Sequence, residues 1–282
     1  MQLVGYEPSG RGSALLVAGE VGDGNTDGNA TPVDRRELAA GDRLSYSLGT
    51  RRCAGTIDDG DHVACDRPSA PYCEYHTDTW ICARCTGTCL KAEMDCYEDH
   101  AVYLAAFAPE TFKVGVTREW RLETRLREQG ADRAAHLYTV SNGRIAREIE
   151  AEIARLLTDR VRTGPKVAAL ANEVDVDAWE STLAELAGFV ADAEIDFEFD
   201  PAAEDLERGV HEKFAFDYGI DLETRPVRET IASGTVVGVK GRLLVLENGG
   251  TTYAVDMRDL VGYELEDGET DRELQSSLGS FG

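Results

Sequence analysis

The spacing of hydrophobic and polar residues changes several times along the chain, and each change marks a predicted element. Near the N-terminus, short apolar stretches with a period of two predict strands at residues 3–6, 13–19 and 43–49. The Gly-, Asn- and Asp-rich stretch at residues 22–32 has the composition of a loop and not of a strand interior. Residues 1–52 are therefore predicted to form an N-terminal β region.

Period-two alternation returns at residues 231–265. Lys240-Gly241 and Gly249-Gly250 mark two turns, so this C-terminal β region should be a three-stranded meander. Neither group of three strands buries much apolar surface alone. We therefore expect the N- and C-terminal strands to join in one small β-barrel, followed by a loose acidic tail at residues 266–282.

The middle of the chain has a mixed pattern. Two apolar strands at residues 102–107 and 112–117 lead into an arginine-rich helix at residues 118–131. A further helix is predicted at residues 145–160, which completes an α/β core over residues 101–163. The fold class is therefore α+β.

Apolar and acidic faces alternate along residues 164–230. This pattern is typical of solvated helices, and it predicts a helical connector between the α/β core and the C-terminal strands.

All seven cysteines lie between Cys53 and Cys96. In a cytoplasmic protein, such clustering favours metal binding over disulfides, and residues 53–100 are predicted to be a zinc-binding region. A first ligand set for tetrahedral Zn²⁺ has the spacing of a small zinc finger and consists of Cys53, Cys65, Cys73 and His76.

A second set offers five candidates for four ligand places: Cys82, Cys85, Cys89, Cys96 and His100. We favour Cys82, Cys85, Cys96 and His100, although Cys89 could replace the histidine and the Cys spacing also permits an iron–sulfur cluster. Four protein ligands leave no place for a reacting water, so both predicted zinc sites are structural.

Charge is distributed unevenly. The chain has 53 acidic and 29 basic residues, a net charge of −24 and only five lysines. This composition is typical of halophilic proteins that work at molar salt, and an acidic surface that binds a basic partner is the alternative. Residues 101–163 do not share this acidic composition, because they contain 11 basic and 9 acidic residues. A basic region in an acidic protein is where a polyanion would bind.

The chain has no run of 18 apolar residues, and its first residues do not resemble a signal peptide, so we expect a cytoplasmic location.

Four motifs carry a resemblance to a known family. They are KVGVTR at residues 113–118, RLREQGADRAA at 125–135, an Ile-Glu pair at 149–150 and GVKGRLLVL at 238–246. Over nearly its full length, the sequence resembles an uncharacterised family of zinc-containing archaeal and bacterial proteins. Its central segment is similar to the GIY-YIG nuclease domain.

The nuclease resemblance implies a catalytic set of four residues. Tyr103 would correspond to the tyrosine of the first motif, Lys113 to the tyrosine of the second, and Arg125 to the arginine that stabilises developing charge. Glu150 would hold Mg²⁺ or Mn²⁺. Two departures weaken the match, because a lysine replaces the second tyrosine and the first motif lacks its glycine. Each of these residues could instead be an ordinary strand or helix-surface residue.

Three functions are compatible with these features. The first is nucleic-acid binding, to RNA more than DNA or to a ribonucleoprotein, through Arg118, Arg121, Arg125 and Arg127. The alternatives are a metal-dependent phosphodiesterase or endonuclease and a protein-interaction scaffold. We favour binding, because the motif tyrosine is missing and two structural zinc sites indicate recognition.

Overall fold

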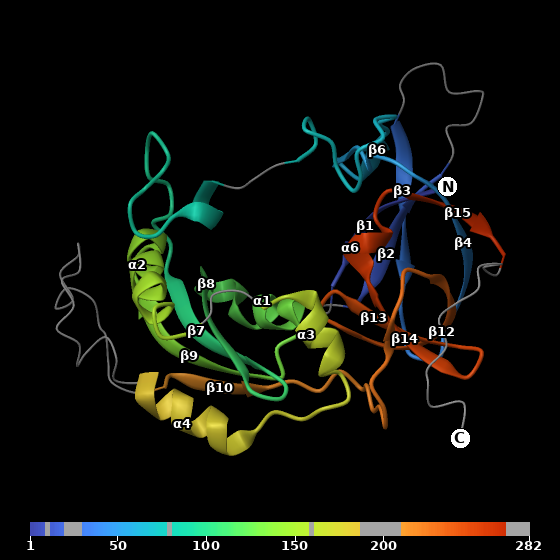
Figure 1. Cartoon of the computed structure of the whole chain (residues 1–282). Coiled ribbons are helices and arrows are strands. Elements are labelled where there is room, and N and C mark those ends of the chain that lie inside the picture. Colours follow the sequence, from blue (N-terminus) through green and yellow to red (C-terminus); the bar gives the residue numbers. More distant parts are fainter. Residues whose placement is uncertain (9–11, 20–29, 78–80, 158–160, 187–209, 269–282) are drawn as a thin grey trace. The chain divides into compact units, whose positions relative to one another are not determined.

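The structure is a computed structural model that describes the chain apart from residues 9–11, 20–29, 78–80, 158–160, 187–209 and 269–282 (Figure 1). The chain forms two compact units. We call residues 1–78 with 218–282 the β unit, and residues 79–217 the α/β unit. The predicted zinc-binding region is thus divided between the two units. No helix in the described part of the chain is long and apolar enough to cross a membrane.

The β unit contains a single sheet, with eleven strands in the described residues, in the order β11-β14-β13-β12-β4-β15-β1-β2-β3-β6-β5. Only the β11–β14 pair is parallel within this described sheet. The elements are β1 (Gln2–Glu7), β2 (Ala14–Ala18), β3 (Ala30–Glu37), β4 (Arg43–Arg51), β5 (Thr56–Asp58), β6 (Asp61–Val63), β11 (Val227–Arg228), β12 (Ala232–Lys240), β13 (Leu243–Asn248), β14 (Thr251–Asp256), α6 (Met257–Leu260) and β15 (Tyr263–Asp267).

Strand β15 lies between β4 and β1, so the N- and C-terminal strands join in one sheet as predicted. Leu3, Leu44, Leu246 and Leu265 come from both ends of the chain and share one buried core. The predicted barrel is wrong, however, because no pairing among the described residues closes the sheet between β11 and β5. The two edges are short strands, and the three residues of β5 are all exposed.

Strand β3 corrects the boundary of the predicted loop at residues 22–32. It begins at Ala30, where β6 pairs with it and supplies partners that the local composition does not reveal. Residues 20–29 of this loop and residues 269–282 of the acidic tail lie outside the described residues.

The described part of the α/β unit has a four-stranded antiparallel sheet in the order β10-β9-β7-β8 (Figure 1). The two predicted strands and the two predicted helices of the core are present, although the second helix begins at Gly143 and ends at Ile153 instead of continuing to residue 160. The elements are η1 (Ile81–Arg84), β7 (His100–Phe107), β8 (Thr111–Arg118), η2 (Glu119–Arg121), α1 (Leu122–Gln129), β9 (Arg133–Val140), α2 (Gly143–Ile153), α3 (Thr163–Ala168), α4 (Val176–Leu186) and β10 (Glu212–Ala215).

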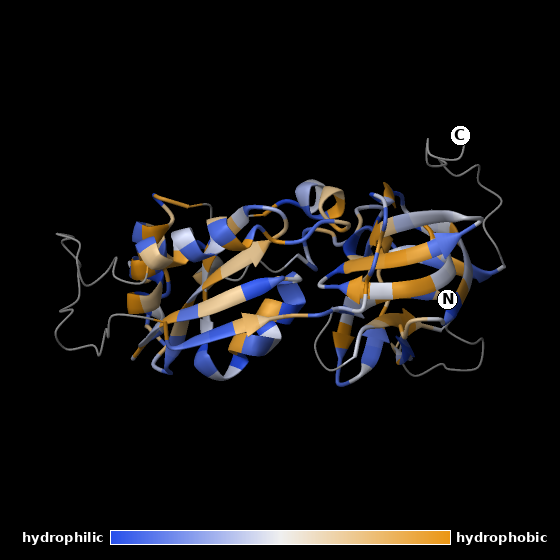
Figure 2. Cartoon of the chain, turned by 90° about the horizontal axis from the view of Figure 1, so that it is seen from below, coloured by the Kyte–Doolittle hydropathy of each residue, from blue (hydrophilic) through white to orange (hydrophobic). Residues whose placement is uncertain are grey.

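Strand β7 is buried on both faces, which explains its continuous apolar sequence. Val102 and Leu104 belong to a core that includes Ile149 of α2 and Trp179 of α4. The alternate residues of β7, such as Tyr103, belong to a second core with α1. Figure 2 shows hydrophobic stretches along the strands of both units. The α/β sheet is therefore a middle layer between helices.

The predicted helical connector at residues 164–230 is only partly helical. It contains α3 and α4, but β10 is a strand, although its residues fall in a predicted helical stretch. Strand β9 provides an open edge, and the ring of Phe214 stacks 6.0 Å from that of Phe216, so tertiary pairing outweighs helical propensity there. Residues 187–209 of the connector lie outside the described residues.

Candidate metal centre and basic groove

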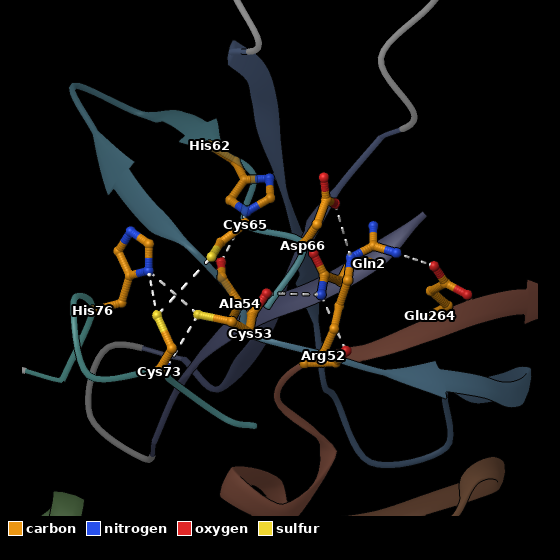
Figure 3. A network of polar contacts seen from close by, with 11 residues as sticks. Gln2, Arg52, Cys53, Ala54, His62, Cys65, Asp66, Cys73, His76 and Glu264 are labelled. Atoms are coloured by element: carbon orange, nitrogen blue, oxygen red, sulfur yellow. Dashed lines mark hydrogen bonds and ion pairs between the residues drawn. The ribbon is translucent and has the colours of Figure 1, made fainter. Parts of the chain in front are cut away.

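The first predicted ligand set converges in the β unit (Figure 3). The ligand atoms of Cys53, Cys65, Cys73 and His76 all lie within 4.8 Å of one another. The Nδ1 atom of His76 lies 3.3 Å from the sulfur atoms of both Cys53 and Cys73, and the Cys65 and Cys73 sulfur atoms are 4.0 Å apart. Tetrahedral bonds of about 2.3 Å place sulfur ligands roughly 3.8 Å apart. The four residues therefore fit a tetrahedral metal ion.

Local sequence explains how these ligands meet. Cys53 follows the end of β4, and the β5–β6 hairpin carries the chain out and back before Cys65. At Gly55, φ is +65° and a Cβ atom would lie 2.1 Å from the Val63 carbonyl oxygen, so only glycine fits there. The backbone N–H of His76 donates to the carbonyl of Cys73 at 3.0 Å, and this turn brings the last two ligands together.

The environment affects the two buried thiols of the centre differently. Burial raises the pKa of Cys53. Burial also opposes ionisation of Cys73, but hydrogen bonds from the Tyr75 backbone and from His76 outweigh it and lower the pKa of that thiol to about 7. A thiolate near neutral pH is the form that binds metal.

Gln2 and Arg52 tie the candidate metal centre to the seam between the terminal strands. The Gln2 amide donates to the carbonyls of Cys53 at 3.3 Å and Gly262 at 3.1 Å (Figure 3). Arg52, next to the first ligand, forms an ion pair with Glu264 of β15. A metal ion here would hold the ligand loop against β1 and β15, which is a structural role.

The second predicted ligand set does not meet in the same way. Among the described residues, the first set is the one compact group of metal-binding side chains. The five candidates of the second set instead line one cavity of about 540 Å³ in the α/β unit, and they are Cys82, Cys85, Cys89, Cys96 and His100. A second metal site is therefore not confirmed.

One pair of these five residues does lie together. A Cβ atom on Gly143 would lie 2.8 Å from Nε2 of His100 and 3.1 Å from Cβ of Cys96. The other ring nitrogen of His100, Nδ1, lies 2.6 Å from the Glu98 carbonyl oxygen. Burial lowers the pKa of His100, which favours its neutral form. A hydrogen bond from Nδ1 to this carbonyl leaves the lone pair on Nε2.

The same cavity is strongly basic, and we call it the basic groove. Its position follows from the β7–β8 hairpin, which pairs His100 with Arg118 and thus places the cysteine-rich segment beside the arginine-rich segment. Among the described residues, Asp95 is the single acid that lines the groove. The basic residues of its lining are Lys91, Arg118, Arg121, Arg125, Arg144 and Arg147.

Acidic side chains outside the lining hold several of these arginines. Glu128 pairs with both Arg121, at 3.0 Å, and Arg125, at 3.2 Å. Glu98 pairs with Arg118 at 3.0 Å. Asp95 pairs with Lys91 at 2.6 Å, and Glu150 pairs with Arg147 at 2.6 Å. These one-to-one pairs balance their cations, but the single carboxylate of Glu128 is shared by two guanidinium groups, so Arg121 and Arg125 together keep a net positive charge.

The structure brings the residues implied by the nuclease resemblance only partly together, around the buried side chain of Tyr103. Gln129 donates to this oxygen at 2.5 Å. Burial raises the Tyr103 pKa, and the charges of Arg125 and Glu150 act on it in opposite directions. Arg125 and Glu150 are therefore close enough to Tyr103 to affect its pKa, while the side chain in hydrogen-bond contact with its hydroxyl group is that of Gln129. The β7–β8 register puts Lys113 on the Tyr103 face of the sheet, but Lys113 does not line the basic groove.

One predicted arginine, Arg127, does not line the groove. It points away, pairs with Glu123 at 2.9 Å and lies over the ring of Phe216.

Three residues that line the groove were not predicted from the sequence: Trp120, Arg144 and Arg147. Arg144 and Arg147 are three residues apart and follow Asn142, the N-cap of α2. This spacing could have indicated that they share one face of the helix.

Comparison with known proteins decides the family. A family model described as "Protein of unknown function (DUF2797)" matches residues 50–265. The chain belongs to this family. The DUF2797 match covers the metal centre and the basic groove, and it confirms the predicted resemblance to an uncharacterised family. Neither the curated proteins nor the solved structures contain a match to the chain.

Proposed function

We propose that this DUF2797 protein binds nucleic acid through the basic groove. The main support for the proposal is the composition of the groove lining. Among the described residues, five arginines and one lysine line the groove together with a single aspartate. The whole chain has a net charge of −24. Most of the surface would therefore repel a polyanion, while the groove attracts it, which limits binding to one place.

The partner that we favour is RNA, free or in a ribonucleoprotein. Arginine forms paired hydrogen bonds with phosphate oxygens, and unpaired RNA segments expose backbone and bases together. Arg121 and Arg125 are each held by Glu128, so their orientation is fixed before a phosphate arrives. Preorganisation lowers the entropy cost of binding.

Zinc has a supporting role in this proposal. Three thiols and one imidazole are the donor set of structural zinc, so we assign Zn²⁺ to the site formed by Cys53, Cys65, Cys73 and His76. A second structural Zn²⁺ would take Cys82, Cys85, Cys96 and His100, with Cys89 as the alternative to the histidine. That ion would stiffen one wall of the basic groove.

Charge reversal tests the proposal. The double variant Arg121→Glu/Arg125→Glu should lose binding to labelled RNA in a fluorescence anisotropy titration. Arg127→Glu is the control, since it reverses a charge outside the groove on the helix that carries Arg125. Equal losses in both variants would contradict a role for the groove. A wild-type protein that binds neither RNA nor DNA would favour the protein-interaction scaffold.

Metal-dependent phosphodiester cleavage is the second candidate. It is favoured by the charges of Arg125 and Glu150, which both act on the pKa of Tyr103. The order β7-β8-α1-β9-α2 is also compatible with a GIY-YIG-like core. In this mechanism Mg²⁺ or Mn²⁺ on Glu150 would polarise the phosphate and Arg125 would stabilise developing charge.

Two features weigh against cleavage. The Tyr103 side chain is only 2% exposed, and burial raises its pKa, so the phenol is a poor base at neutral pH. The carboxylate of Glu150 is already engaged by Arg147. Incubation of labelled RNA and DNA with Mg²⁺ or Mn²⁺ decides between the candidates, because cleavage lost in Glu150→Ala with binding retained would establish the nuclease.

A further inference from the structure

Trp120 is the most exposed large apolar side chain in the basic groove. It lies in η2, between Arg118 and Arg121, and its side chain is 72% exposed. Leaving the indole ring in water is less favourable than burying it, and Trp120 belongs to neither hydrophobic core of the α/β unit. Such a residue in a charged groove is a candidate binding platform.

Two neighbours hold the indole ring in place. Its Nε1 atom lies 3.5 Å from a carboxylate oxygen of Glu98, and the same oxygen pairs with Arg118 at 3.0 Å. The guanidinium carbon of Arg121 lies 5.9 Å from the ring centroid, within the range of a cation–π contact. Both contacts favour this orientation of the ring, and Arg118 and Arg121 stand on either side of it in sequence.

We propose that the groove accepts a single-stranded segment of nucleic acid, with one base stacked on Trp120 and the flanking phosphates on Arg118 and Arg121. This inference rests on the proposed function and specifies its ligand. A base face is open to an indole ring only where the strand is unpaired, because base pairs in a duplex cover one another. The cavity volume of about 540 Å³ is that of a small-molecule site and suits one or a few nucleotides, not a duplex.

The test compares one strand in two forms. Labelled 12-nucleotide RNA and DNA strands of mixed sequence, and the corresponding duplexes, are titrated with the full-length protein at constant KCl. Wild-type protein should bind the single strands at least about tenfold more tightly than the duplexes. Trp120→Ala should weaken single-strand binding roughly ten- to hundredfold. Trp120→Phe, which keeps an aromatic face, should restore most of the affinity.

Tyr97→Ala is the matched control. Tyr97 is also 72% exposed and lies near the groove in sequence, but it does not line it, so its removal should leave affinity unchanged. Because Trp120 is exposed, its removal should not unfold the protein, and a thermal melt of each variant verifies this.

Different failures point to different conclusions. If Trp120→Ala binds single strands as tightly as wild type, or if wild type prefers duplexes, the stacking proposal is overturned. The proposed function would survive that result as long as Arg121→Glu/Arg125→Glu still abolishes binding. If wild-type protein binds neither form, both the stacking proposal and the proposed function are overturned.

Discussion

Arg147 and Glu150 form an ion pair of 2.6 Å on α2, and their side chains are only 20% and 14% exposed. The glutamate that the nuclease resemblance assigns to a metal ion is thus occupied by a cation of the same helix. Arg147 also lines the basic groove, whereas Glu150 does not. The pair therefore connects the two candidate functions, because a metal ion on Glu150 would have to displace an arginine of the groove.

Removal of the carboxylate at position 150 separates these functions. In Glu150→Ala, Arg147 loses its partner and becomes free to contact phosphate, so affinity for RNA should stay the same or rise up to about tenfold. Glu150→Gln keeps the shape of the side chain and serves as the control for packing. Anisotropy titrations measure both variants, and a marked loss of binding in both would contradict the assigned role of Arg147.

The ring of Tyr103 lies directly over Gly115 of the neighbouring strand. A Cβ atom at position 115 would lie 2.5 Å from the Tyr103 hydroxyl oxygen and 2.6 Å from Cζ. We expect Gly115→Ala to destabilise the α/β unit by about 1–3 kcal/mol through overpacking, measured by chemical denaturation. Gly164→Ala is the control, because a Cβ atom there would meet nothing within 4 Å. Equal stability of the two variants would refute the close approach.

The sequence pattern predicts those elements whose structure depends mainly on residues close together in the sequence. The apolar run of β7, the two turns of the C-terminal meander and the spacing of Cys53 to His76 are local signals, and the corresponding elements are present. Strand β9 was missed and β10 was predicted as helix, because pairing with a distant strand decides both.

The basic groove could not be predicted in full for a similar reason. His100 and Arg118 are far apart in sequence, and only the register of the β7–β8 hairpin brings them together. The arginines of α2 then complete the lining from a third segment. Charge counting found the basic region, but it could not separate Arg125, which lines the groove, from Arg127 on the same helix, which does not.

Zinc content tests the two proposed metal sites independently. Elemental analysis of wild-type protein should give close to two zinc ions per chain. Cys53→Ser should remove one, and Cys85→Ser should remove the other, since the ligand sets share no residue. A wild-type content of one that falls to zero in Cys53→Ser would support the site formed by Cys53, Cys65, Cys73 and His76 and eliminate the second site. Substantial iron that is lost in Cys85→Ser would contradict the zinc assignment of the second set.

Charge composition predicts salt-dependent folding. With 53 acidic and 29 basic residues, the folded protein should repel itself at low ionic strength. Screening by KCl reduces this repulsion, so Tm should rise steeply as KCl increases into the molar range. Circular dichroism melts at increasing KCl measure the effect, and a flat profile would reject the halophilic interpretation.

The central claim is that arginines of the basic groove contact phosphates, and the salt dependence of binding tests it most directly. Each phosphate contact with a single strand contributes roughly 0.7 to the slope of log affinity against log salt concentration. Arg121→Gln/Arg125→Gln should therefore lower the magnitude of that slope by about 1.4 relative to wild type. Arg127→Gln should leave it unchanged. Equal slopes for wild type and the double variant would contradict the claim.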